Sequence, residues 1–91
     1  MGWSEIKEAI RVDLLARRLK EPRLRLSALD GLEKLLAGRY PNFLSNPEVL
    51  LEVGKAEVTK NLARAKKAGD LNGAEKSVLN EIFARLAGAS S

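Results

Sequence analysis

The 91-residue chain contains no cysteine and no histidine. Without cysteine it has no disulfide, no thiolate metal ligand and no thiol nucleophile. Without histidine it lacks the commonest general base and the commonest ligand of transition metals. These two absences exclude most catalytic and metal-binding classes. We expect a protein that is not an enzyme and that holds no metal and no cofactor.

The carboxylates do not form an acid–base pair either. Glu8 and Asp13 are five residues apart, so they do not face each other on a helix as residues three or four apart do. Glu48 and Glu52 are four residues apart, but they lie at an expected helix start, where the helix dipole favours acids. A glycine-rich phosphate loop is also missing. We therefore predict no catalytic residue.

Aromatic residues and long apolar runs are scarce. Only 4% of the residues are aromatic, so the core must be aliphatic. No apolar run approaches the roughly 18 residues of a membrane span, and the N-terminus lacks the apolar segment of a signal peptide. We expect a cytoplasmic protein without membrane contact. A composition rich in arginine, leucine and alanine without cysteine is typical of a thermophile protein.

Apolar residues recur at helical spacing in four segments, which predicts an all-α fold, a small four-helix bundle with one long helix. The first helix is expected to begin after Ser4, which would cap it, and to run to about Lys20. Pro22 is expected to end this helix, because the residue before a proline is pushed out of the helical conformation.

The second helix follows a short connector. The alternation in Arg23-Leu24-Arg25-Leu26 predicts four extended residues, too few for a sheet. Ser27 is expected to cap the helix, whose apolar face lies within residues 29–36. Gly38 is the residue expected just beyond its end.

The third helix is predicted to be long, over residues 47–68. Ser45-Asn46-Pro47-Glu48 combines a capping side chain, a proline at the first helical position and an acid. Gly69 would end the helix, and Gly54 inside it marks either a close helix crossing or a bend. The fourth helix is predicted over residues 74–87. Residues 1–88 would form a single domain, with 89–91 as a frayed tail.

Positive charge is concentrated in two segments, residues 17–25 and 55–67. Sixteen lysines and arginines face twelve acids, a net charge of +4. Lys60, Arg64 and Lys67 are spaced four and three residues apart, which places them in a row on one helix face. Such a row either contacts phosphates by charge alone or is a solvated helix exterior. The candidates for contact with a DNA or RNA backbone are Arg17, Arg18, Arg23, Arg25, Lys60, Arg64 and Lys67.

Large apolar side chains near the first helix and in the following loop are candidates for a protein interface. The first helix has apolar residues over much of its circumference, which predicts association with another copy or with a different subunit. Trp3 could instead pack against the first turn as a staple, and the 40–44 loop could cover the end of the bundle. The interface candidates are Trp3, Ile6, Ile10, Tyr40 and Phe43.

The order of these segments resembles the helical A-domain of the GINS family, subunits of the archaeal and eukaryotic replicative helicase assembly. The resemblance lies in a proline–leucine connector (residues 21–26, EPRLRL), a short helix (29–36), a long helix (49–68) and a terminal segment (71–83). The family's small β-rich domain has no counterpart in these 91 residues, and Ala28-Leu29-Asp30 stands where the family has an acidic-aromatic run. The resemblance implies a helical, non-enzymatic scaffold that binds protein partners at a replication fork.

Two functions remain open at this point. The first is a non-catalytic helical accessory or scaffold subunit of a DNA replication or other nucleic-acid-processing complex, which binds protein subunits and contacts the phosphate backbone. The alternative is a stand-alone small basic DNA- or RNA-binding protein without sequence specificity, since no recognition-helix pattern is present. Neither function involves a small-molecule substrate.

Overall fold

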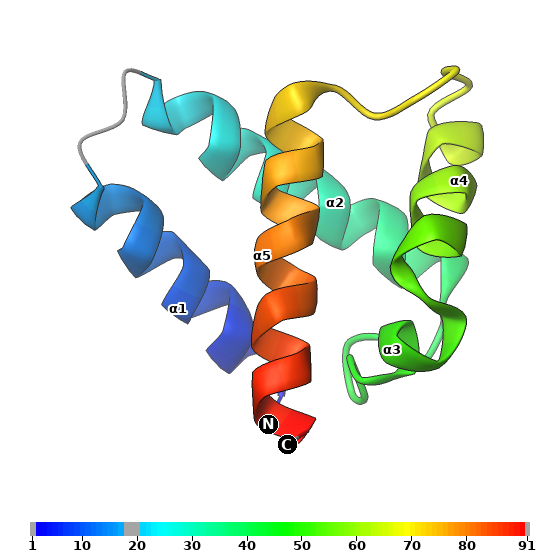
Figure 1. Cartoon of the computed structure of the whole chain (residues 1–91), viewed down its shortest axis with the longest axis horizontal. Coiled ribbons are helices and arrows are strands. Elements are labelled where there is room, and N and C mark those ends of the chain that lie inside the picture. The colour runs from blue at the N-terminus through cyan, green and yellow to red at the C-terminus, as the bar shows by residue number, and fades with distance from the viewer. Residues whose placement is uncertain (1, 18–20, 91) are drawn as a thin grey trace.

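A computed structural model describes residues 2–17 and 21–90 of the chain (Figure 1). This part of the chain contains helices and no strand, which confirms the predicted all-α class. The helices are α1 (Trp3–Ala16), α2 (Pro22–Arg39), α3 (Val49–Val53), α4 (Lys55–Ala65) and α5 (Gly73–Ser90).

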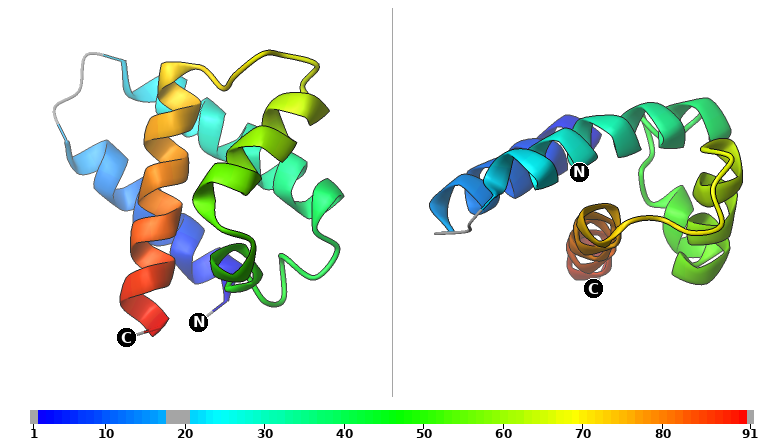
Figure 2. Two further views of the ribbon diagram at one scale, coloured as in Figure 1. Left: turned by 45° about the vertical axis from the view of Figure 1, so that its right-hand side comes forward. Right: turned by 90° about the horizontal axis from the view of Figure 1, so that it is seen from above.

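α5 contacts α1, α2 and α3. α1 and α2 lie side by side behind α5, and α3 and α4 lie on its other flank (Figures 1 and 2). α4 also packs against α2. As a result, α1 and α4 lie at opposite sides of the molecule (Figure 1).

The core is aliphatic, as the composition predicts. Leucines and isoleucines of α1, α2 and α5 meet at its centre, and α3 and α4 add Leu50, Val58 and Leu62. Two aromatic residues complete it at one end, where the rings of Trp3 and Phe43 lie 4.8 Å apart between centroids. The burial of these apolar side chains is the main driving force of the fold.

The start of α2 differs from the prediction. Pro22 opens α2 rather than only ending α1, because its fixed φ suits the first helical position, where its missing N–H costs nothing. The prediction of an extended connector over residues 23–26 is therefore wrong. These leucines and arginines are good helix formers and belong to α2. Ser27 and Gly38 lie inside α2 and cap neither end.

The predicted third helix is two helices. Gly54 adopts φ +94° and ψ 147°, a conformation open almost only to glycine, and separates α3 from α4. The predicted bend at Gly54 is thus confirmed, but the prediction of a single long helix over residues 47–68 is wrong. The longest helices are α2 and α5 with 18 residues each. The bundle therefore has five helices in its described part rather than four.

The remaining helix ends also differ in detail. α1 begins at Trp3 with Gly2 as its cap, so Ser4 lies inside the helix, and Lys20 lies outside the described residues. α5 is the fourth predicted helix and continues to Ser90. It starts with a reciprocal cap, in which Asn72 Oδ1 accepts from the Glu75 N–H and Glu75 Oε1 accepts from the Asn72 N–H.

No helix of the described residues is long and apolar enough to cross a membrane.

Candidate functional site

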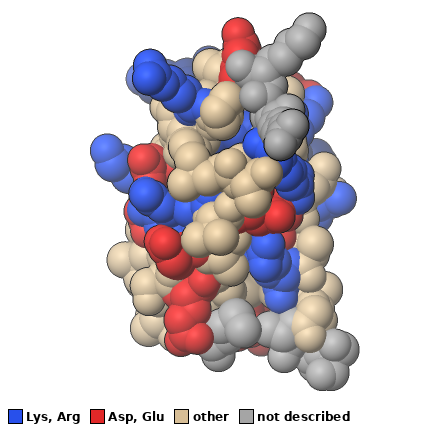
Figure 3. All heavy atoms as spheres, turned by 90° about the vertical axis from the view of Figure 1, so that its left-hand side faces the viewer, with Lys and Arg blue, Asp and Glu red and all other residues tan. Residues whose placement is uncertain are grey.

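The cations of α1 and α5 are all paired with carboxylates. The pairs of α1 are Lys7 with Asp30 and Glu33, and Arg11 with Glu8; those of α5 are Lys76 with Asp70, and Arg85 with Asp13. On the side of the molecule where α1 lies, blue and red atoms are accordingly intermingled (Figure 3). This side presents charges of both signs rather than a basic surface.

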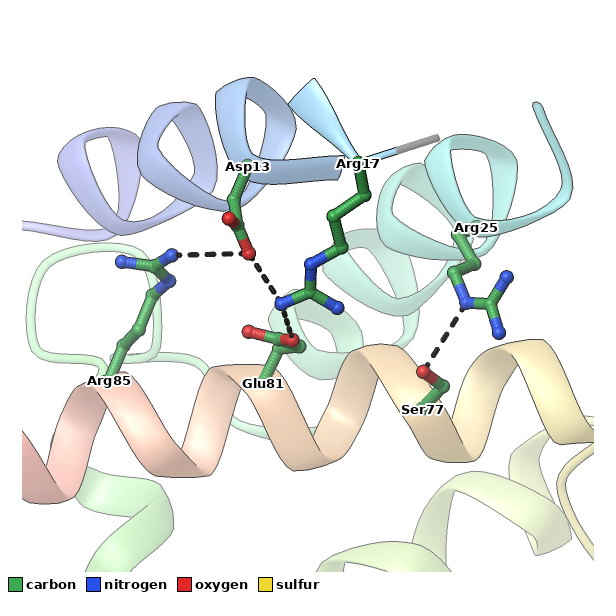
Figure 4. Close-up of polar contacts among 6 residues, drawn as sticks. All are labelled: Asp13, Arg17, Arg25, Ser77, Glu81 and Arg85. Carbon is green, nitrogen blue, oxygen red and sulfur yellow. Dashed lines mark hydrogen bonds and ion pairs between the residues drawn. The ribbon is translucent and has the colours of Figure 1, made fainter. Parts of the chain in front are cut away.

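Arg17 belongs to a network that links α1 to α5 (Figure 4). Its guanidinium donates to Glu81 and to Asp13 at 2.5 Å each. The hydrogen bond to Glu81, more than the charge of Asp13, raises the pKa of Arg17 above its ordinary value. Arg25 approaches α5 as well, with its Nε donating to Ser77 Oγ at 3.4 Å. These two predicted phosphate ligands thus have partners within the fold.

The other predicted phosphate ligands outside α4 are Arg18 and Arg23. Arg18 lies outside the described residues. Arg23 is exposed near the start of α2 and forms no ion pair with another described residue. It stands apart from the α4 row, because α2 begins at the far side of the molecule from α4 (Figure 1).

α4 carries a row of exposed cations. Val58 and Leu62 are fully buried on one side of the helix, whereas Lys60 and Arg64 are exposed on the other. Lys67 follows in the first turn beyond α4 and is also exposed. We call Lys60, Arg64 and Lys67 the α4 row; none of the three forms an ion pair with a described residue.

Lys67 adopts the left-handed conformation, with φ 57°. The Lys67 N–H donates to the Arg64 carbonyl and the Ala68 N–H to the Ala63 carbonyl, the two hydrogen bonds of a Schellman motif. Glycine is the usual residue at this position, because a side chain there costs about 1–2 kcal/mol. The chain instead keeps a cation at the end of the row. The helix therefore ends before Gly69, three residues earlier than predicted.

The five predicted interface residues form part of the core. Trp3, Ile6, Ile10 and Phe43 are at most 3% exposed, and Tyr40 is 8% exposed. The interface prediction is corrected accordingly, because these side chains contact their own chain. Trp3 is the first residue of α1 rather than the residue before it, so the staple prediction is not met; its ring packs on Phe43, and its indole N–H donates to Glu33 on α2.

Other apolar side chains are exposed instead. Val12 and Leu15 on α1 are 57% and 60% exposed, and Leu24 on α2 is 56% exposed. The wide apolar surface of the first helix predicts the exposure of the first two, whereas the interface candidates of this helix lie on its buried stripe. The described residues also contain no group of three carboxylates that could hold a metal ion.

No family model, no curated protein and no solved structure matches this chain.

Proposed function

We propose that the chain is a non-catalytic helical accessory subunit that contacts the phosphate backbone of nucleic acid through the α4 row. The observation that carries this proposal is the contrast between the unpaired cations of α4 and the carboxylate-paired cations of α1 and α5. Unpaired, exposed cations are free to displace the counterions of a polyanion, which supplies affinity without sequence specificity.

The extent of the row favours a nucleic-acid strand over a single phosphate. Lys60 and Arg64 are four residues apart, or about 6 Å along α4, and Lys67 follows beyond the end of the helix, so the row extends past one phosphate group. Trp3, Tyr40 and Phe43 are buried, so these rings offer no platform on which bases could stack. Both features favour contact with the backbone alone. The one acid on this exposed face, Glu57, leaves the face positive.

The accessory role rests on the opposite side of the molecule. Val12, Leu15 and Leu24 are exposed there, far from α4. Three side chains bury much less than the ~800 Å² per partner of a stable interface. We therefore propose contact with a different subunit on the same nucleic acid rather than a stable dimer. The GINS resemblance likewise implies a non-enzymatic scaffold that binds protein partners at a replication fork.

Charge reversal on α4 tests the proposal. Lys60→Glu with Arg64→Glu should weaken binding to a labelled 20-base-pair DNA duplex by more than about tenfold at 50 mM salt, because two phosphate contacts become repulsive. The matched control, Arg11→Glu with Lys34→Glu, makes the same change in net charge at exposed positions of α1 and α2. Equal losses in both variants would show that net charge alone drives binding.

Lys67→Gly separates binding from folding. Glycine suits the left-handed position, so this variant should unfold at a higher temperature than the wild type by several degrees. Because it removes one cation of the row, it should also bind the duplex more weakly. A variant that is more stable and binds as well as the wild type would remove Lys67 from the proposed site.

A further inference from the structure

Arg39, the last residue of α2, is held on an aromatic ring. Its guanidinium carbon lies 5.3 Å from the centroid of the Tyr40 ring, a cation–π contact. Tyr40 is 8% exposed, so its ring has a fixed position at the end of α2. Arg39 itself is exposed and forms no ion pair with a described residue.

Tyr40 connects this guanidinium to α4. Asn61 on α4 donates a hydrogen bond from Nδ2 to the Tyr40 hydroxyl oxygen at 3.0 Å. The hydrogen bond is buried, and α4 packs against α2 (Figure 2). Arg64 is three residues beyond Asn61, so the two occupy neighbouring positions on the helix surface. The contact therefore holds the end of α2, where Arg39 lies, against α4, the helix that carries Lys60 and Arg64.

We infer that Arg39 is a fourth phosphate ligand of the nucleic-acid surface and that Tyr40 and Asn61 position it. The inference rests on the proposed function of the α4 row. The contact with Tyr40 involves no carboxylate, and Arg39 forms no ion pair with a described residue, so its N–H groups can donate to a phosphate. It also restricts a long side chain before binding, which lowers the entropy lost on contact.

The surface then draws on two helices. Lys60 and Arg64 lie on α4, Lys67 follows just beyond its end, and Arg39 lies at the end of α2, which packs against α4. The phosphates of a single strand could contact the cations of α4 alone. Cations on two helices are better matched by the wider phosphate surface of a duplex. We therefore infer that the ligand is a nucleic-acid duplex rather than a single strand.

The salt dependence of binding measures the contribution of Arg39. For the full chain and a labelled 20-base-pair DNA duplex, each phosphate contact adds about 0.9 to the slope of log K against log salt. Arg39→Gln should therefore lower the slope by about 0.9 and the affinity about 8-fold at 0.1 M salt. Lys34→Gln, at another exposed position of α2, should leave both unchanged.

A positioning role for Tyr40 has its own signature. Tyr40→Leu removes the ring but keeps all cations, so it should weaken binding without changing the slope. A slope that falls as in Arg39→Gln, or an affinity equal to the wild type, would overturn this role. A thermal melt of each variant verifies that it is folded under the binding conditions.

Two further outcomes separate the inference from the proposed function. If Lys60→Gln lowers the slope and Arg39→Gln does not, Arg39 is no ligand, and the α4 row stands without it. If neither variant lowers the slope, the proposed function fails together with the inference. Tighter binding to a 20-nucleotide single strand than to the duplex would overturn the inferred ligand class.

Discussion

Glu33 joins the two N-terminal helices. Its carboxylate on α2 accepts hydrogen bonds from the buried Trp3 indole and, at 2.8 Å, from the Lys7 ammonium of α1. The hydrogen bond from Lys7, and to a lesser extent the one from Trp3, holds the pKa of Glu33 below its usual value. The hydrogen bond between Lys7 and Glu33 also raises the pKa of Lys7. The stabilisation from Glu33 is thus present above its usual pKa, 4.5, and is lost as the pH falls through the lower folded value. That from Lys7 is lost only as the pH rises through its raised pKa, above 10.5.

Substitution of Glu33 tests this linkage. Glu33→Ala should lower the free energy of unfolding at pH 7 by about 1–3 kcal/mol, because the buried Trp3 N–H loses its acceptor. Glu33→Gln keeps an acceptor oxygen and should cost less. Urea unfolding at pH 7 and pH 3 measures both, and the difference between wild type and Glu33→Gln should shrink at pH 3. A difference of equal size at both pH values would contradict the linkage.

Sequence patterns predict which residue types fill the core, but not which of them face a partner. The stripe of Ile6 and Ile10 has the spacing of a buried face, and it is buried. The same spacing is compatible with an interface, and only the arrangement of the other helices decides between the two. Glu81 and Ser77, the α5 partners of Arg17 and Arg25, lie more than 50 residues away in the chain, so no local pattern indicates them; only the pairing of Arg17 with Asp13, four residues away, is local.

Among the elements, α3 and α4 show how one residue divides a helix. A continuous apolar stripe and a strong start signal predict a single helix over residues 47–68. Gly54 interrupts it with a backbone conformation that other residues adopt at a cost of about 1–3 kcal/mol. The sequence locates the irregularity but does not distinguish a tolerated glycine from a break, because both place a glycine inside an apolar pattern.

Two glycine-to-alanine substitutions compare these cases. Gly54→Ala should lower the free energy of unfolding by about 1–3 kcal/mol through backbone strain, since no atom lies within 4 Å of the added methyl group. Gly38→Ala lies inside α2 in equally open space and should raise it by about 0.5–1 kcal/mol. Thermal unfolding distinguishes the two. A stabilising Gly54→Ala would show that the break at Gly54 is not required by the fold.

At the scale of the whole molecule, charge is distributed unequally between the two sides. Carboxylates pair with Lys7, Arg17 and Arg85 between α1, α2 and α5, whereas the α4 row forms no ion pair with a described residue. The spacing of Lys60 and Arg64 predicts that they share one face of α4, because it depends on helix geometry alone, whereas Lys67 lies beyond the helix in the left-handed conformation. The position of Arg39 beside the row could not be predicted, since it depends on the contact between Tyr40 and Asn61.

The most direct test of the proposed function is the salt dependence of duplex binding with the α4 row neutralised. Lys60→Gln with Arg64→Gln should lower the slope of log K against log salt by about 1.8, because two phosphate contacts are lost. Arg11→Gln with Lys34→Gln, which removes the same charge elsewhere, should leave the slope at the wild-type value. Equal slopes for the two double variants would contradict the assignment of nucleic-acid contact to α4.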